Sequence, residues 1–168
     1  SSAKQQYVVL GVTGPNEYEN NVNNNWYTNY SAQWCLNYTA KIIEEMRDDS
    51  PEEAARIEAK TAFESAELEQ WKKTAALMYL PEDKNLNVVI QQDGFLDKEM
   101  IKVADLDPKE RPINQHWSWD RILRSPYIKQ ADVLQGMYFF EDQFEEDTLR
   151  RNFDFYEPFT VHESSLSP

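Results

Sequence analysis

The sequence predicts a mainly α-helical fold, layered or toroidal, with a few short strands in its loops. Apolar residues recur at three- or four-residue spacing over long stretches, and prolines and capping residues mark where helices begin and end. Long loops join these stretches, and no regular alternation of strands and helices of the kind that builds a parallel sheet is visible. Residues 1–168 contain no internal repeat or low-complexity linker, so we expect a single segment without a domain boundary.

The first 25 residues predict a short strand and a loop. Residues 7–12 are rich in β-formers, and Gly11 and then Gly14-Pro15 break the backbone, so we expect a buried strand leading into a loop. Residues 16–25 contain six asparagines. Because asparagine side chains compete for backbone hydrogen bonds, a regular helix is not expected before about Trp26.

The remaining elements follow from periodicity and capping. A long helix is expected from Trp26 to about Arg47. Ser50-Pro51-Glu52-Glu53 supplies an N-cap, a proline at the first helical position and a capping-box glutamate, which predicts a helix to about Lys60. The later expected elements are a helix at 65–79, a short extended piece at 86–90, a loop at 96–116, helices at 118–124, 128–140 and 147–153, and a final loop.

Composition excludes several classes of function. The chain carries 30 acidic and 17 basic residues, a formal net charge of −13, and such a surface repels nucleic acid and anionic lipid. No signal peptide and no run of about 20 apolar residues is visible. Cys35 is the only cysteine, which fits a reducing, cytoplasmic compartment, and its helical phase predicts a buried thiol. Two dispersed histidines do not indicate a metal site.

Both ends of the chain look cut. A strand-like run begins almost at once, and the chain stops at a Ser-rich stretch without a tail. A fragment of a larger protein explains this pattern more simply than a complete one.

Glu17 is the first candidate for chemistry. It follows Gly14-Pro15-Asn16 on a loop at the end of the expected strand, where a carboxyl group can be held rigidly in a cleft. Aromatic neighbours would desolvate it and raise its pKa, as a general acid requires, and the surrounding amides would bind sugar hydroxyls. The alternative is a glutamate on a solvated, Asn-rich turn, which composition alone favours.

Two further segments have binding chemistry. Lys129 and Gln130, at an expected helix start, have the reach to contact hydroxyls or an oxyanion, although an ordinary solvated helix N-terminus explains them locally. Ser164 and Ser165, with their backbone amides, suit anion capture. A flexible Ser-rich chain end is the alternative.

Five segments in order give the sequence a family resemblance. It resembles the inverting disaccharide phosphorylases of glycoside hydrolase family 65, which include maltose, trehalose and kojibiose phosphorylases, and PNEYENNVNNN is closest in wording to the maltose phosphorylases. The matching segments are VTGPNEYENNVNNNWYTNY at 12–30, ELEQWKKTAALMYLP at 67–81, QQDGFLDKE at 91–99, KQADVLQGMYFF at 129–140 and NFDFYEPFTVHESSLS at 152–167.

The resemblance implies a fold and a set of site residues. It implies that residues 1–168 are the later half of an (α/α)6-barrel catalytic domain. Glu17 matches the general acid, and Lys129 and Gln130 match the pair that contacts the glucose on the non-reducing side of the cleaved bond. Ser164 and Ser165 match the phosphate-binding serines, and Glu19 and Asn20 lie in the loop beside the acid, next to the departing sugar. A family Trp-Asp pair and a later phosphate-contacting histidine have no counterpart here.

The implied activity is phosphorolysis of maltose with inversion, giving β-D-glucose 1-phosphate and glucose. Phosphate is the co-substrate, no cofactor is needed, and no catalytic base is needed because phosphate is already an anionic nucleophile. We expect partners in the remaining segments of the same enzyme, a homodimer, and no activity from this piece alone. The alternatives are a trehalose- or kojibiose-type phosphorylase, a glucoside hydrolase, and a non-catalytic carbohydrate-binding module.

Overall fold

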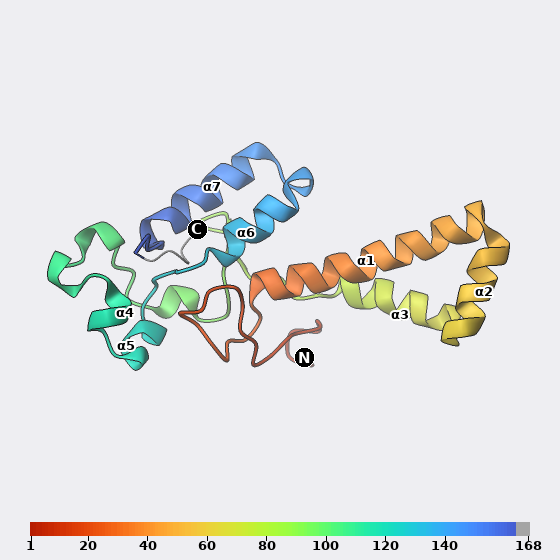
Figure 1. Ribbon diagram of the computed structural model, residues 1–168, viewed down its shortest axis with the longest axis horizontal. Coiled ribbons are helices and arrows are strands. Elements are labelled where there is room, and N and C mark those ends of the chain that lie inside the picture. Colours follow the sequence, from red (N-terminus) through yellow and green to blue (C-terminus); the bar gives the residue numbers. More distant parts are fainter. Residues whose placement is uncertain (164–168) are drawn as a thin grey trace. The chain divides into compact units, whose positions relative to one another are not determined.

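The structure is a computed structural model that describes residues 1–163, and the chain forms two compact units (Figure 1). The first unit comprises residues 1–8 and 29–79, and the second comprises residues 9–28 and the chain from Leu80 onward. Helix α1, Trp26–Asp49, begins in the second unit and belongs mostly to the first. Across residues 1–163 the regular structure is helical apart from one two-stranded sheet, which confirms the mainly α fold class.

The first unit is built on α1, α2 (Pro51–Thr61) and α3 (Ser65–Ala76). Arg47 Nε donates to Glu58 Oε1 at 2.7 Å and ties α1 to α2, and Gln33 Nε2 donates to the Ala75 carbonyl at 2.8 Å and ties α1 to α3. The predicted helix at 65–79 ends early, at Ala76. The backbone after it pairs with Tyr7 instead, whose N–H donates to the Leu77 carbonyl at 2.8 Å.

The capping box lies on a different helix from the one predicted. Ser50 precedes α2, but its side chain makes no capping hydrogen bond. Glu53 instead binds Arg56, one helical turn along, with Arg56 Nε 2.8 Å from Glu53 Oε2. A capping box forms at the start of α3, between Glu64 and Glu67. A charged partner at three-residue spacing therefore outcompetes the backbone N–H for the Glu53 carboxylate.

Two further predictions for the N-terminal half are wrong. Residues 7–12 form no regular strand; Tyr7 and Val12 make only isolated bridges, to Met78 and Val22, and Gly11 between them has a φ of 66°. Cys35 is exposed and not buried. The apolar stripe of α1 is only partly covered, since Tyr38 on the same helix is 49% exposed.

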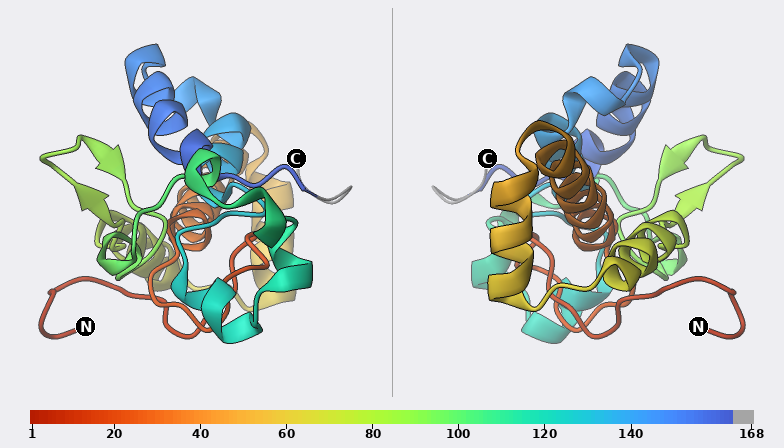
Figure 2. Two further views of the ribbon diagram at one scale, coloured as in Figure 1. Left: turned by 90° about the vertical axis from the view of Figure 1, so that its left-hand side faces the viewer. Right: turned by 90° about the vertical axis from the view of Figure 1, so that its right-hand side faces the viewer.

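The second unit combines a hairpin with short helices. Strand β1 (Glu82–Asp83) pairs antiparallel with β2 (Val88–Val89), with Glu82 opposite Val89, and the hairpin appears as the green arrows in Figure 2. The α-helices that follow are α4 (Ile113–His116), α5 (Trp119–Arg124), α6 (Asp132–Phe139) and α7 (Glu146–Tyr156). The 3-10 turns are η1 (Phe95–Asp97), η2 (Val103–Asp105), η3 (Pro108–Glu110), η4 (Glu141–Gln143) and η5 (Glu157–Phe159).

A buried cluster holds this second unit together. Its members come from distant parts of the sequence and are Tyr18, Ile113, Ile122, Tyr127 and Val161. Elsewhere in the unit Trp26 lies against α6, where a Cβ at Gly136 would stand only 2.7 Å from the Trp26 ring. Glycine at 136 therefore permits a close helix approach that no other residue allows.

Helix α6 begins at Asp132, four residues later than the predicted start at 128. The chain before it is extended, because Ile128 N–H donates to the Phe159 carbonyl at 2.9 Å and the Ile128 carbonyl accepts from Val161 N–H at 2.8 Å. Lys129 and Gln130 consequently lie in a bend between this bridge and the start of α6, and not on a helix. Among residues 1–163, no helix has both the length and the apolar character to span a membrane.

Candidate active site

The loop that carries Glu17 is shaped by its asparagines. Val12 and Val22 exchange two backbone hydrogen bonds of 2.9 Å at its base, and Glu19 N–H donates to the Asn16 carbonyl at 3.0 Å within it. Asn21 and Asn24 have φ values of 52° and 53°, a conformation that asparagine tolerates better than most residues. The Asn-rich composition is therefore explained first by the turns it allows.

Several of these amides are used inside the fold. Asn16, Asn24 and Asn25 are buried, and Asn24 Nδ2 donates to Asp93 Oδ2 at 2.7 Å. Asn25 precedes α1 and caps it, since its Oδ1 accepts from Thr28 N–H at 3.0 Å. The expectation that the amides of this loop serve sugar hydroxyls is wrong for these three residues.

The segment with Lys129 and Gln130 lies directly against the Glu17 loop. Asn16 Oδ1 accepts from the Lys129 backbone N–H at 2.9 Å, and Gln130 Oε1 accepts from the Glu17 backbone N–H at 3.2 Å. The Glu17 carboxylate forms an ion pair with Lys129 Nζ and lies 3.4 Å from Gln130 Nε2. The three residues that the sequence singled out from segments more than 100 positions apart therefore meet in one place.

Glu17 is exposed, and its electrostatics differ from the expectation. The pKa of its carboxyl group is lowered, chiefly by the hydrogen bond from Lys129, then by the lysine charge and by Gln130. The aromatic neighbours do not desolvate it, because Tyr18 and Trp26 are themselves buried in the core. As arranged here, the Glu17 carboxylate is paired with a cation, which opposes its protonation.

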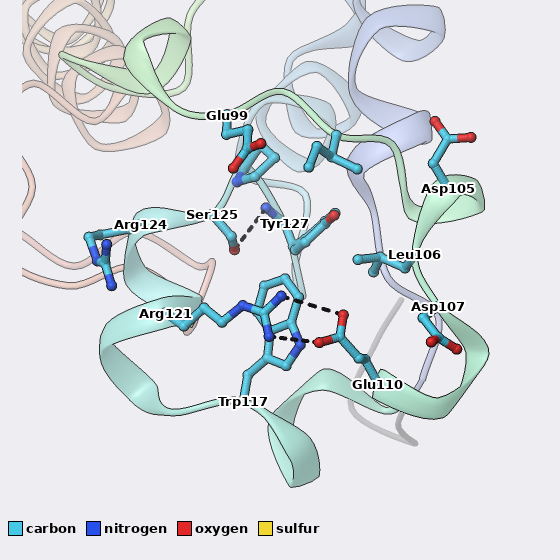
Figure 3. A pocket seen from close by; sticks show the side chains of 12 residues that line it. Glu99, Asp105, Leu106, Asp107, Glu110, Trp117, Arg121, Arg124, Ser125 and Tyr127 are labelled. Atoms are coloured by element: carbon cyan, nitrogen blue, oxygen red, sulfur yellow. Dashed lines mark hydrogen bonds and ion pairs between the residues drawn. The ribbon is translucent and has the colours of Figure 1, made fainter.

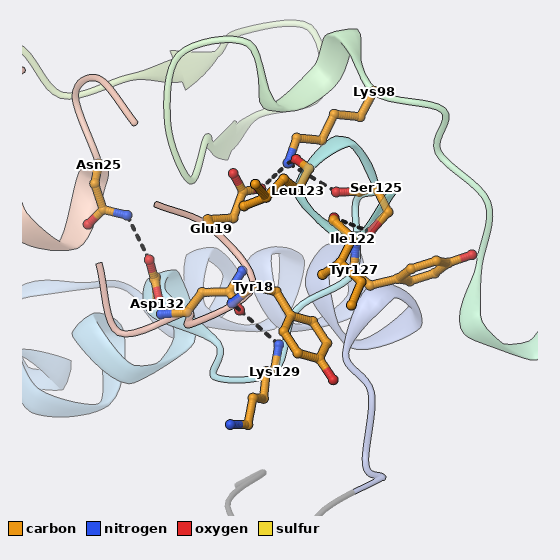
Figure 4. Close-up of polar contacts among 11 residues, drawn as sticks. Tyr18, Glu19, Asn25, Lys98, Ile122, Leu123, Ser125, Tyr127, Lys129 and Asp132 are labelled. Carbon is orange, nitrogen blue, oxygen red and sulfur yellow. Dashed lines mark hydrogen bonds and ion pairs between the residues drawn. The ribbon is translucent and has the colours of Figure 1, made fainter. Parts of the chain in front are cut away.

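Glu19 and Asn20 lie on the same loop but differ in exposure. Asn20 is exposed. Glu19 is buried and paired with Lys98, whose ammonium also donates to the carbonyls of Leu123 at 3.2 Å and Ser125 at 3.0 Å (Figure 4). Burial raises the pKa of Glu19, and Lys98 opposes that shift. Glu19 thus fastens the loop to the end of α5.

Asp132 is a site residue that sequence reasoning did not single out. It is 1% exposed, and it accepts from the Asn16 backbone N–H at 2.5 Å and from Asn25 Nδ2 at 2.6 Å. Burial raises its pKa to about 7. A signal was present: Asp132 is the first residue of a mostly apolar helix and the only charged one in it, on the same face as the buried Gly136 at four-residue spacing.

The phosphate-site candidates Ser164 and Ser165 lie outside the described residues. The described chain ends at Glu163, whose Oε2 accepts from Ile113 N–H at 2.8 Å and whose carboxylate pairs with Arg111.

A cavity of about 540 Å³ lies elsewhere in the second unit (Figure 3). Arg121 lies over the Trp117 ring at 3.6 Å and donates to Glu110 Oε1 at 2.8 Å, so its charge is already paired. Burial raises the pKa of Tyr127, on the same wall, to about 12. The lining includes none of Glu17, Lys129 and Gln130, and the cavity is therefore not the site assembled around Glu17.

Comparison with known proteins places the chain. The sequence model of the family described as "Glycosyl hydrolase family 65 central catalytic domain" matches residues 1–168. The chain is 54% identical over its full length to maltose phosphorylase of Bacillus subtilis, of which it covers 21%. It is 41% identical over 97% of its length to α,α-trehalose phosphorylase of Thermoanaerobacter brockii, again 21% of that protein.

A solved structure gives the same result for the fold. The chain matches a solved structure described as a kojibiose phosphorylase from the human microbiome, with a TM-score of 0.85 and 37% sequence identity. The match covers 99% of this chain and 22% of that one, and it agrees with a fragment of an (α/α)6 fold. The chain thus spans about a fifth of the length of the relatives it matches. It belongs to glycosyl hydrolase family 65 and lies within the central catalytic domain of that family.

Proposed function

We propose that this chain supplies the general acid and part of the glucose-binding site of a disaccharide phosphorylase. The observation that carries the proposal is the contact of the Glu17 carboxylate with Lys129 and Gln130. The favoured substrate is maltose, because identity is 54% to a maltose phosphorylase, against 41% to a trehalose phosphorylase and 39% to a kojibiose phosphorylase.

The reaction follows from one acid and one nucleophile. Protonated Glu17 donates to the glycosidic oxygen as the bond from that oxygen to the anomeric carbon breaks through an oxocarbenium-like transition state. A phosphate oxygen bonds to the anomeric carbon from the opposite face. The α-1,4 bond of maltose is thereby converted with inversion to β-D-glucose 1-phosphate and free glucose, and Glu17 is left as a carboxylate.

Lys129 links substrate binding to the state of the acid. In the free site its ammonium holds Glu17 ionised. When hydroxyl groups of the glucose unit engage Lys129 and Gln130, the carboxylate loses its cationic partner and is covered by the sugar, and both changes raise its pKa. The substrate therefore favours the protonated form of Glu17 that its own cleavage requires.

The rest of the proposal concerns Asn20 and parts of the enzyme beyond the described residues. Ser164 and Ser165 hold phosphate on the face opposite Glu17, and Asn20 contacts the departing sugar. The remaining segments of the catalytic domain complete the site, so the 168 residues alone are inactive. The whole enzyme needs no cofactor, is a cytoplasmic homodimer, and binds neither nucleic acid nor membrane.

The test uses the full-length polypeptide that contains this chain. With maltose, we expect glucose 1-phosphate only when phosphate is added, and proton NMR should show its β-anomer. Glucose release without phosphate would indicate a hydrolase. Glu17→Gln should lower turnover by about 10²–10⁴. Glu53→Gln is the matched control, because Glu53 is also a glutamate held ionised by a cation. Full turnover in Glu17→Gln would refute the assignment of the acid.

A further inference from the structure

Two buried polar residues lock the Glu17 loop to the segment that carries Lys129. The Asn16 side chain accepts from the Lys129 backbone N–H at 2.9 Å, and the Asp132 side chain accepts from the Asn16 backbone N–H at 2.5 Å. Each residue thus holds the backbone of the other segment. Asn16 directly precedes Glu17 in sequence, and Asp132 follows Gln130 by two positions. Figure 4 shows the Lys129 contact and Asp132 together.

The second oxygen of Asp132 extends this interlock to the start of α1. Asn25 Nδ2 donates to Asp132 Oδ2 at 2.6 Å (Figure 4). The Oδ1 of the same amide accepts from Thr28 N–H at 3.0 Å. Asn25 therefore caps the helix with one end of its amide and holds the carboxylate with the other. The position of Asp132 is fixed by a helix end and a loop at once.

The loop passes so close to Asp132 that a side chain at position 14 has no room. A Cβ at Gly14 would lie 2.2 Å from Asp132 Oδ2 and 2.5 Å from Asn25 Nδ2. Glycine is thus required at position 14 because the Asp132 carboxylate lies so close. A positive φ is not the reason, since Gly14 does not have one.

Stability alone gives little reason for this arrangement. The hydrogen bonds described for Asp132 come from neutral groups, and burial raises its pKa to about 7. Asn16 Nδ2 is buried without a hydrogen-bond partner among the described residues. A buried carboxylate without a cation and an orphaned amide both carry a desolvation cost. Such costs are typical of sites where geometry is maintained for function.

We propose that Asp132 is a positioning residue for the general acid: together with Asn16 it fixes the backbone at Glu17 relative to Lys129 and Gln130. This inference rests on the proposed role of Glu17. Because Asp132 is 1% exposed and lies behind the loop, it touches no substrate and acts only through the placement of the acid. Misplacing a reacting group by about 1 Å can lower a rate about 10²-fold.

The experiment exchanges the two partners in the full-length enzyme. In Asp132→Asn, the new amide faces the Asn25 amide, donor against donor. In Asn25→Asp, two carboxylates face each other. The double exchange Asn25→Asp with Asp132→Asn restores the contact in reverse. The amide introduced at position 132 would donate to the carboxylate introduced at position 25 and still accept from the Asn16 N–H. That carboxylate would keep an oxygen for the Thr28 N–H, and aspartate caps helices as well as asparagine does.

We expect kcat to fall about 10- to 100-fold in each single variant, with little change in KM, and to recover in the double exchange. The pH profile of kcat/KM supplies a readout that simple destabilisation leaves unchanged. Loosening the contact of Glu17 with Lys129 raises the pKa of the acid, so the basic limb should move to higher pH in Asp132→Asn.

Two outcomes would overturn the inference while the wild type remains active: an unchanged kcat in Asp132→Asn, or a double exchange that restores the melting temperature but not kcat. If Asp132→Asn does not fold, Asn25→Ser is used, because serine still caps α1 but lacks the amide donor to Asp132. An unchanged kcat there would also overturn it. Failure of the proposed function appears separately, as phosphate-independent glucose release by the wild type or as full turnover in Glu17→Gln.

Discussion

The side chain of Asn16 accepts a hydrogen bond from the backbone of Lys129 across 113 positions of sequence. This contact sets the Glu17 loop beside the segment that carries Lys129 and Gln130. It also makes the state of Glu17 depend on Lys129, because the ammonium of that lysine reaches the Glu17 carboxylate. The first prediction follows from this dependence.

Lys129→Met should raise the pKa of Glu17. In the wild type Lys129 lowers the pKa of Glu17 by a hydrogen bond and by its charge. Removing the lysine therefore lets the Glu17 carboxyl group stay protonated to higher pH. Since the acid must be protonated to act, the basic limb of the kcat/KM profile should move to higher pH. KM for maltose should rise as well, because a sugar contact is lost. Arg56→Met, which removes the cation held by Glu53, should leave the profile in place.

Glu17→Gln should discriminate between leaving groups. Glucose must be protonated as it departs from maltose, whereas fluoride leaves α-D-glucosyl fluoride as a stable anion. The variant should therefore lose about 10²–10⁴ in phosphorolysis of maltose and far less with the fluoride, measured as phosphate-dependent fluoride release. Equal losses on both substrates would indicate that Glu17 supports the site structurally and does not deliver a proton.

Gly14→Ala should impair the enzyme more than Gly94→Ala. At Gly14 the added methyl group would meet Asp132 Oδ2 and the Asn25 amide, whereas at Gly94 the nearest atom is 3.7 Å away. Gly94 has a φ of 78°, so alanine there costs about 1 kcal/mol in backbone strain alone. We expect Gly14→Ala to lower both the melting temperature and kcat, and Gly94→Ala to lower only the melting temperature. A normal kcat in Gly14→Ala would contradict the close approach.

Lys98→Met alone should destabilise the fold more than the double variant that carries both Lys98→Met and Glu19→Gln. The Lys98 and Glu19 side chains are 13% and 8% exposed, so removing the lysine leaves a buried carboxylate without its cation. Breaking such a pair costs about 3–5 kcal/mol, whereas removing both charges costs less. Thermal unfolding of the single and double variants gives the comparison. An additive loss in the double variant would show that the two charges do not interact.

Much of the local structure could be read from the sequence. Helical spacing predicts α1 and the proline at position 51 predicts α2, because both signals depend on residues within a few positions of one another. The family resemblance rested on contiguous segments and is confirmed by the match to residues 1–168. The non-helical backbone before α6 was missed because the hydrogen bonds of Ile128 go to residues 159 and 161, on a distant segment.

The sequence by itself made Glu17, Lys129 and Gln130 candidates, chiefly through the family resemblance, because the matching motifs are written in contiguous stretches. Only the tertiary structure decided the charge state of Glu17, the burial of Asp132, and the internal use of Asn16 and Asn25. Electrostatic shifts and buried hydrogen bonds depend on which groups lie within a few ångströms. That proximity is set by packing between segments more than 100 positions apart.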